Sequence, residues 1–236
     1  MPHFYYYGID IFYLTLILPA FILSLIAQIK VKSTFSKYSK ISASKDLTGA
    51  GAAEAVLSAH GVNDVRVERV AGNLTDHFDP RTKVIRLSDS VYSSRSVAAI
   101  GVAAHEAGHA VQYAQGYGPI KIRNSLVPVV NFGSSFSWIA ILLGFAFSNN
   151  LLILVGIGLF SFAALFQLIT LPVEFNASKR ALETISSKGL LSGGEEQKGA
   201  KKVLTAAAMT YVAAVVMSLA QLLRLLLLFS RRRNRY

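Results

Sequence analysis

Cysteine is absent from this 236-residue sequence, and acidic residues are few. Without cysteine there are no disulfide bonds and no thiolate metal sites, so any bound zinc must be held by histidine and carboxylate side chains. The 13 Asp and Glu residues stand against 24 Lys and Arg residues, which gives a formal net charge of +11. The shortage of acids narrows the search for carboxylate ligands to a small set of positions.

The basic residues do not have the distribution of a nucleic-acid-binding surface, where they alternate with aromatic residues on a soluble face. They flank long apolar runs instead, at Lys30–Lys40 after the first run and at Arg231–Arg235 after the last. Attraction to anionic lipid at a membrane surface explains this placement better. We therefore predict no nucleic-acid partner.

Polar stretches are short, because 53% of the residues are hydrophobic and the mean hydropathy is +0.44. A helix needs roughly 20 apolar residues to cross a bilayer. Four runs approach or exceed that length, namely Ile11–Ile29, Leu126–Phe147, Leu151–Val173 and Val203–Phe229. The second and third are predicted to form a transmembrane hairpin. The fourth contains Arg224 and precedes the basic tail, so both a full and a partial crossing stay open.

The first apolar run lacks the features of a cleaved signal peptide. Met1–Asp10 contains no Lys or Arg, and no A-x-A-like cleavage site follows the run. We expect an uncleaved anchor with the N-terminus outside, and an interfacial aromatic belt at Tyr5–Tyr7. The hairpin then leaves Lys30–Asn124 and Glu174–Lys202 on the same, inner side of the membrane.

This topology divides the chain into five expected segments. They are an anchor (1–29), a polar domain (30–124), a transmembrane hairpin (125–173), a third-ligand helix with a Gly-rich loop (174–202), and a C-terminal hydrophobic helix with a basic tail (203–236).

Two half-buried strands are predicted in the polar domain, at Val65–Val70 and Lys83–Ser88, because both segments alternate at period two. Asp76 and His77 are expected in a solvated hairpin loop between them, and Asp79–Thr82 carries a turn signal. We also consider that Lys83–Ser88 pairs with an extended substrate, as an exposed sheet edge can.

The segment His105–His109 reads H-E-x-x-H. On a helix, residues four apart share a face, so the two imidazoles can bind one zinc ion. Glu106 lies beside the first histidine, where it can act as general base toward a water molecule on the metal. Ser96 is the predicted N-cap of a helix that ends near Ala114. Gly108 costs this helix about 1 kcal/mol relative to Ala, which close packing of another element or simple tolerance would explain.

A catalytic zinc site has three protein ligands and one position open to water. The extended pattern H-E-x-x-H-x-x-G-x-x-H would supply a third histidine, but Gln112 and Gln115 occupy its Gly and His positions. Beyond His109 the sequence offers a short list of carboxylates: Glu174, Glu183, Glu195 and Glu196.

Glu174 is the preferred third ligand. It follows the third apolar run at the membrane edge, just after Pro172, which fits a kink or a helix restart. A carboxylate in that position is costly without a partner, and zinc would provide one. Glu183 is the second choice, and its alternative role is a surface charge near Lys179 or Arg180.

The motif, the apolar hairpin and the segment Leu171–Leu182 (L-P-V-E-F-N-A-S-K-R-A-L) together resemble the YugP-like membrane zinc metallopeptidases of bacteria. The resemblance covers nearly the whole chain, including Asn73–Thr82 and Val84–Ser88. It implies that Glu106 is the base and that the zinc ligands are His105, His109 and Glu174.

The chain looks more distantly like the HtpX-type membrane gluzincins. Those proteins carry an aspartate four residues after the ligand glutamate, and Ser178 stands at that position here. The departure means that their second carboxylate does not carry over. Asn176 or another group is expected to orient a ligand instead.

We therefore expect a mainly α-helical membrane protein with three to four transmembrane helices and a small α+β zincin-like domain that carries the H-E-x-x-H helix. The predicted function is hydrolysis of peptide bonds by a zinc-activated water, with Glu106 as general base. A zinc hydrolase of small amides and a non-catalytic membrane scaffold with a structural zinc are the alternatives.

Expected partners are protein or peptide substrates, membrane proteins among them, and the lipid bilayer. Topology and resemblance place the chain in a bacterial inner membrane, multi-pass, with its site on the cytoplasmic side.

Overall fold

A computed structural model describes residues 10–233 of the protein. The expected aromatic belt at Tyr5–Tyr7 and the end of the basic tail at Arg235 lie outside these residues. The fold divides into two compact units. Unit 1 contains the chain up to Ala27, Ile122–Leu171 and the chain from Thr210 on, whereas unit 2 contains Gln28–Lys121 and Pro172–Met209.

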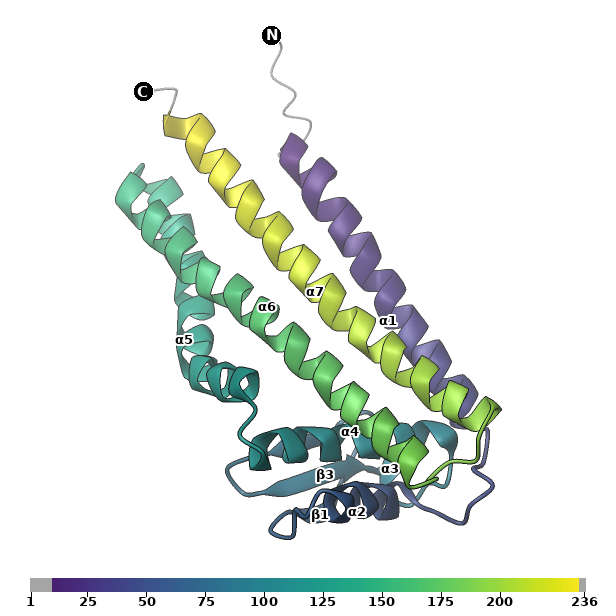
Figure 1. The fold of residues 1–236 in the computed structure, drawn as a ribbon. Coiled ribbons are helices and arrows are strands. Elements are labelled where there is room, and N and C mark those ends of the chain that lie inside the picture. The colour runs from purple at the N-terminus through teal and green to yellow at the C-terminus, as the bar shows by residue number, and fades with distance from the viewer. Residues whose placement is uncertain (1–9, 234–236) are drawn as a thin grey trace. The chain divides into compact units, whose positions relative to one another are not determined.

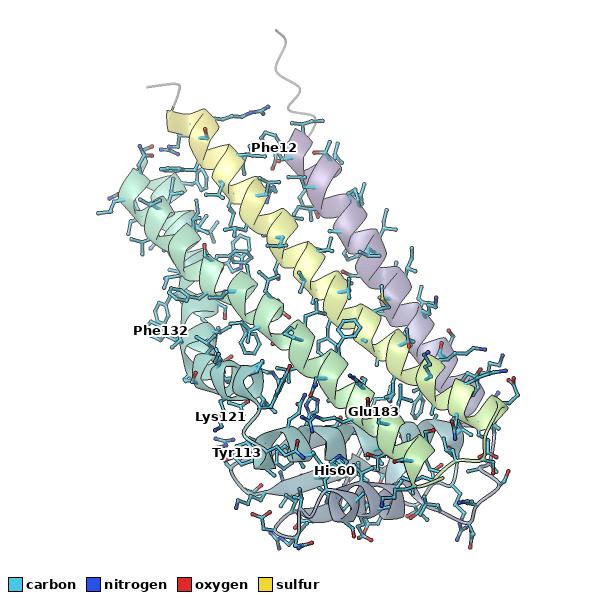
Figure 2. The ribbon with its side chains drawn as sticks, in the orientation of Figure 1. Phe12, His60, Tyr113, Lys121, Phe132 and Glu183 are labelled. Atoms are coloured by element: carbon cyan, nitrogen blue, oxygen red, sulfur yellow. The ribbon has the colours of Figure 1, made fainter. Side chains whose placement is uncertain are left out.

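Within residues 10–233, four helices are long and apolar enough to cross a membrane, so the expected number of three to four becomes four candidate spans. The first begins as a π-helical turn, η1 (Tyr13–Ile17), and continues as α1 (Leu18–Tyr38) (Figure 1). The others are α5 (Gly118–Ala146), α6 (Asn150–Ser187) and α7 (Glu195–Arg233). Their large apolar side chains point outward in many places, as Phe132 does in Figure 2. Pro172 does not restart the helix, because α6 runs through it without a break.

Within unit 1, α5 and the first part of α6 form a helical hairpin. Two of its glycines allow close approach, because an added Cβ on Gly144 would lie 2.6 Å from Ile153 Cγ1 and one on Gly156 would lie 2.5 Å from Ile141 Cγ1. Membrane helices pack closely through such small residues. The charge inside the fourth apolar run is compensated, since Arg224 Nε donates to Asp10 Oδ2 at 3.0 Å.

Unit 2 contains a three-stranded sheet of order β1-β3-β2. The central strand β3 (Val84–Ser88) is parallel to β1 (Arg66–Val70) and antiparallel to β2 (His77–Asp79). The two predicted strands are present, but β2 is three residues long and too short to show a period-two pattern. The hypothesis that Lys83–Ser88 offers a free edge to substrate is wrong, because β3 is paired on both sides.

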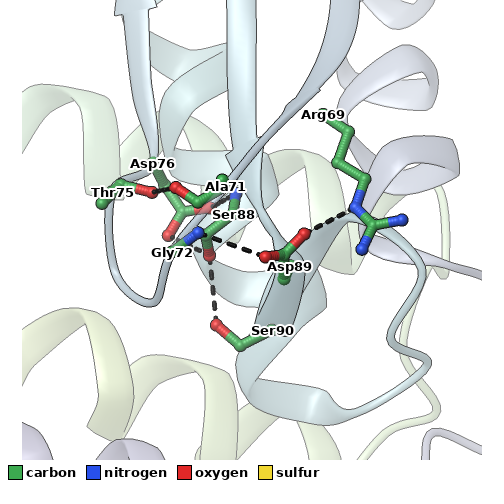
Figure 3. A network of polar contacts seen from close by, with 8 residues as sticks. All are labelled: Arg69, Ala71, Gly72, Thr75, Asp76, Ser88, Asp89 and Ser90. Atoms are coloured by element: carbon green, nitrogen blue, oxygen red, sulfur yellow. Dashed lines mark hydrogen bonds and ion pairs between the residues drawn. The ribbon is translucent and has the colours of Figure 1, made fainter.

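The solvated hairpin loop predicted at Asp76 and His77 is confirmed only in part. Asp76 lies in the loop before β2 and His77 is exposed, but Asp76 is half-buried, and β1 and β3 are parallel and so form no hairpin. His77 begins β2, and the carboxylate of Asp76 accepts hydrogen bonds from the Ser88 backbone N–H at 2.7 Å and from the Ser88 hydroxyl at 3.0 Å (Figure 3). Next to them, Asp89 accepts a hydrogen bond from Arg69 Nε at 2.6 Å. These polar contacts hold the ends of β1 and β3 together with the start of β2.

Three further helices of unit 2 are α2 (Gly49–Ala59), α3 (Asp89–Tyr92) and α4 (Val97–Ala114). The helix α4 begins as predicted, because the Ser96 side chain accepts a hydrogen bond from the Ala99 N–H at 3.2 Å. α2 packs against α4, and both contact the sheet. The core between them is fully buried and includes Val56, Ile85, Leu87, Ile100 and Val111. This core holds the H-E-x-x-H helix rigidly in place.

Candidate metal centre

His105 and His109 lie one turn apart on α4 and meet Glu174 of α6 inside unit 2. His105 Nε2 is 3.3 Å and His109 Nε2 is 3.4 Å from the same oxygen, Oε2 of Glu174. Among the described residues, these three side chains form a cluster whose possible ligand atoms all lie within 4.8 Å of one another. The fold therefore brings together the two motif histidines and the preferred carboxylate, which lies 69 residues after His105.

The separations between these donor atoms fit a tetrahedral zinc ion. Two donors that each lie about 2.1 Å from such an ion are about 3.4 Å apart, because the tetrahedral angle sets their separation. The observed 3.3 and 3.4 Å agree with this value. A direct hydrogen bond between imidazolium and carboxylate would be shorter, at about 2.7–2.9 Å. The donor set of two imidazoles and one carboxylate is also one that zinc uses in hydrolytic sites.

The three candidate ligands are shielded from solvent. Glu174 is 2% exposed and His109 is 8% exposed. Burying a carboxylate is costly unless it is hydrogen-bonded, paired or bound to a metal. The burial therefore supports a metal site over three unrelated surface side chains.

Gly108 allows α6 to approach α4 this closely. A Cβ at Gly108 would lie 2.6 Å from the backbone oxygen of Ala177, which is shorter than real Cβ contacts. Of the two explanations for this glycine, close packing of another element is thus the one observed. Since Ala177 lies three residues after Glu174 on α6, the same contact determines how closely Glu174 approaches the two histidines of α4.

Gln112 forms a hydrogen bond with Nδ1 of His109, the ring nitrogen that does not face Glu174. Its Oε1 lies 3.1 Å from His109 Nδ1, and its Nε2 donates to the Val173 carbonyl at 2.8 Å and to Asn176 Oδ1 at 2.9 Å. The side chain is fully buried. Both donors of the amide are used in this way, so Oε1 must accept, and His109 Nδ1 must carry the proton.

Arg180 fixes the direction of this amide chain. A guanidinium can only donate, and Arg180 Nε donates to Asn176 Oδ1 at 2.7 Å. Asn176 therefore presents its oxygen to Gln112, which turns the Gln112 oxygen toward His109. This orientation affects the metal centre, because a proton on His109 Nδ1 leaves His109 Nε2 with a lone pair that faces Glu174.

His105 is held in a similar manner by a hydroxyl. Ser178 Oγ lies 3.1 Å from His105 Nδ1, so it can accept the Nδ1 proton and leave Nε2 as the donor atom for a metal. The expectation that Asn176 or another group orients a ligand agrees with these contacts, although Asn176 acts through Gln112. Both histidines are thus oriented by neutral side chains.

Glu106 is half-buried on α4 beside the cluster. Burial raises the pKa of its carboxyl group to about 7; Glu174 and Asp76 act in the same direction, while His105 and His77 lower it. The strand β2 runs past this part of α4, and its Phe78 ring packs edge-on against Tyr113, with ring centroids 6.0 Å apart. An edge of the sheet therefore lies next to the H-E-x-x-H helix.

The other downstream carboxylates are not in this cluster. Glu183, labelled in Figure 2, is exposed. It pairs with Lys179 at 3.8 Å, as its alternative role predicts. Glu195 pairs with Lys198 at 3.2 Å, and Glu196 accepts a hydrogen bond from the Ser192 N–H at 2.9 Å.

Gln112 is the residue that sequence reasoning overlooked, since its position served only to exclude a third histidine. Its spacing is a usable signal, because a residue three positions after a histidine lies on the same helix face. Metal-binding histidines regularly donate their second N–H to such a neighbour. Of its two partners on α6, Asn176 was expected to orient a ligand, whereas the Val173 carbonyl has no sequence signal.

Comparison with known proteins identifies the family of the chain. A family model described as "Putative neutral zinc metallopeptidase" matches residues 13–230. The chain is 50% identical over 207 residues to "Putative membrane protease YugP" of Bacillus subtilis (strain 168), which covers 88% of this chain and 92% of the relative. No solved structure matches the chain. The family match spans nearly all of the sequence and includes both α4 and α6, and on this evidence the chain belongs to the family described as neutral zinc metallopeptidases.

Proposed function

We propose that this protein is a membrane-bound zinc metalloprotease whose metal ligands are His105, His109 and Glu174. The observation that carries the proposal is the convergence of two imidazole Nε2 atoms on one carboxylate oxygen, at 3.3 and 3.4 Å. The family of the chain and the printed name of its relative support peptide bonds as the target. A second candidate, hydrolysis of small amides, would use the same site.

The proposed chemistry divides between the metal and the chain. A zinc ion in the site supplies Lewis acidity toward a substrate carbonyl and an attacking water. The carboxylate of Glu106 accepts the proton of that water and later delivers it to the leaving amine. Gln112 and Ser178 keep the two histidines in the tautomer that presents Nε2. An extended peptide can add to the outer edge of β2, which lies beside α4.

We further propose that the protein lies in a bacterial inner membrane with this site on the cytoplasmic side. The support is the charge distribution, because lysines follow the first span at Lys30–Lys40 and precede the last at Lys198–Lys202. Basic residues favour the cytoplasmic ends of membrane helices. The relative from Bacillus subtilis is likewise named a membrane protease.

The proposal is tested by zinc content and proteolysis of the full-length protein in detergent, beside Glu106→Gln. We expect one zinc ion per chain in both proteins. Turnover of a peptide or protein substrate should fall by about 10²–10⁴-fold or more in the variant, because loss of a general base removes that much. A wild type that binds no zinc contradicts both enzymatic functions.

Two further outcomes separate the alternatives. If Glu106→Gln retains zinc and stability and no wild-type hydrolysis is found on proteins, peptides or small amides, the site is structural and the protein is a scaffold. If only small amides are cleaved, the protein is a hydrolase of another substrate class. Glu54→Gln is a suitable control, because Glu54 is an exposed glutamate on α2 of the same unit.

A further inference from the structure

A groove on unit 2 lies between the C-terminal part of α1 and the N-terminal part of α7, and no step of the proposed hydrolysis uses it. Its volume is about 680 Å³, which is within the range of about 300–1,000 Å³ found for small-molecule sites. Nine of its eleven lining residues are lysines or carry a hydroxyl group, and the lining comprises Lys30, Ser33, Thr34, Lys37, Tyr38, Lys198, Lys201, Lys202, Thr205, Ala206 and Met209.

Helical spacing places these polar groups on two facing surfaces. On α1, Lys30 and Lys37 are seven residues apart with Ser33 and Thr34 between them, so all four share one face. The lysines of α7 and Thr205 repeat at the same three- and four-residue intervals. None of the lining residues is acidic. The ion pair of Lys198 with Glu195, which is just outside the groove, leaves the positive charge of the lining in large excess.

The walls of this groove are held at a set distance by one close contact. Gly199 of α7 lies directly against the ring of Tyr38, so that an added Cβ would be 2.6 Å from Tyr38 Cδ1. Tyr38 is buried at this crossing. The ammonium group of Lys37 lies 5.6 Å from the centroid of the same ring. The groove is therefore formed by packed helices and not by a chance cluster of surface lysines.

We propose that this groove binds the phosphate group of an anionic phospholipid. Ammonium and hydroxyl groups are the donors that bind phosphate oxygens, and basic pockets between membrane helices recognise such headgroups. The groove also has an apolar end. Ala206 and Met209 of α7 line this end. A lipid uses both ends, because its acyl chains continue along the apolar part, whereas free phosphate uses only the basic end.

The test measures lipid binding to the full-length protein in a zwitterionic detergent by native mass spectrometry. Short-chain phosphatidylglycerol is titrated beside phosphatidylcholine with the same chains, glycerophosphoglycerol and inorganic phosphate. Wild type should bind phosphatidylglycerol most tightly. Lys30→Gln combined with Lys201→Gln and Lys202→Gln should weaken that binding by about tenfold or more, because each lysine near an anionic lipid contributes several-fold.

A matched control replaces Lys32, Lys40 and Lys45 by glutamine, since these exposed lysines of unit 2 do not line the groove. It should change the affinity by less than about twofold if attraction is local to the groove. A second pair of variants retains every lysine: Ser33→Asp introduces a negative charge into the groove, and Ser36→Asp places it elsewhere on α1. Only Ser33→Asp should weaken lipid binding.

Three results would overturn the proposal. One is equal affinity for phosphatidylglycerol and phosphatidylcholine in the wild type. Another is an equal loss in the groove variants and their controls, which would indicate general surface charge. The third is inorganic phosphate or glycerophosphoglycerol binding as tightly as the lipid, which would make the groove a site for a soluble anion. None of these results depends on zinc or on proteolysis.

Discussion

The two units use the same apolar residue types in opposite ways. In unit 2, Ile85, Leu87 and Ile100 are fully buried in the core between α2, α4 and the sheet. In unit 1, Phe147 is 75% exposed and Leu151 is 69% exposed, and they are two of many. Exposed apolar surface costs about 25 cal/mol per Å² in water but nothing comparable in hydrocarbon. The surface of unit 2 therefore suits an aqueous environment, and the surface of unit 1 suits the hydrocarbon of a bilayer.

Polar groups show the same contrast. In unit 1, the charge of Arg224 is compensated by Asp10, which is a local solution for two costly groups in an apolar helix bundle. In unit 2, polar side chains of α4 and α6 form a directed chain from Arg180 to His109. A chain of this kind orients a reactive group, whereas an isolated ion pair only balances charge. The candidate metal centre and the polar chain that orients its histidines both lie in unit 2.

The largest effect should come from removing the candidate carboxylate ligand. We expect Glu174→Ala to lose most of its zinc, because two imidazoles alone leave the metal with one protein ligand too few. Zinc per chain, measured on purified protein by elemental mass spectrometry, checks this. Glu183→Ala is the matched control on the same helix and should retain full zinc. If Glu174→Ala keeps its zinc and Glu183→Ala loses it, the third ligand is Glu183 and not Glu174.

A lysine on an exposed apolar position should distinguish lipid from water. Leu165 of α6 in unit 1 and Ile41 in unit 2 are exposed to similar extents, 45% and 40%. Leu165→Lys should cost about 2.5–3.5 kcal/mol of insertion free energy, because a charge near the centre of a membrane helix is unfavourable. Ile41→Lys should cost nearly nothing. The amount of membrane-integrated protein after carbonate extraction measures both, and equal yields would contradict the division between the units.

Two glycines on α4 should respond to alanine with opposite signs. Gly108→Ala should destabilise the fold by about 1–3 kcal/mol, because its Cβ would collide with the Ala177 backbone and overpack the contact. Gly101→Ala meets Ala200 at an ordinary 3.5 Å and should gain up to about 1 kcal/mol of helix propensity. Thermal unfolding of both variants checks the signs. A stabilising Gly108→Ala would mean that α6 does not approach α4 closely.

An effect on metal affinity alone should come from the amide that orients His109. We expect Gln112→Ala to lower zinc affinity by about 10–100-fold, which is the usual cost of losing such an outer partner. Zinc competition with a chromophoric chelator measures it. Gln115→Ala should leave the zinc affinity near the wild-type value. Gln115 is exposed, and its side chain bonds to Arg180, the residue of the hydrogen-bond chain that is farthest from His109. Equal losses in both variants would show that Gln112 has no special role.

Much of the fold can be predicted from the sequence because it is local. A helix requires hydrogen bonds between near neighbours, so apolar runs predict α5, α6 and α7, and the Ser96 cap predicts the start of α4. The parallel pairing of β1 with β3 is not the pairing of a hairpin, so the pattern does not predict it. The pattern predicts a loop at Asp76 and His77, and this is wrong for His77, which begins β2. The short strand β2 carries too few residues for a period to be visible.

The sequence by itself determined that two histidines and a glutamate share one helix, and that cysteine has no part in any metal site. It also limited the third ligand to a few carboxylates. Only the tertiary structure decided which of these carboxylates lies beside the two histidines, since Glu174 and Glu183 are on the same helix and differ in which face meets α4. In the sequence, Gln112 only excluded the extended histidine motif, whereas the structure shows that its side chain is the hydrogen-bond partner of His109. The physical reason is that helix formation depends on neighbours in the chain, whereas ligand geometry depends on packing between helices, which here follows from the space left by Gly108.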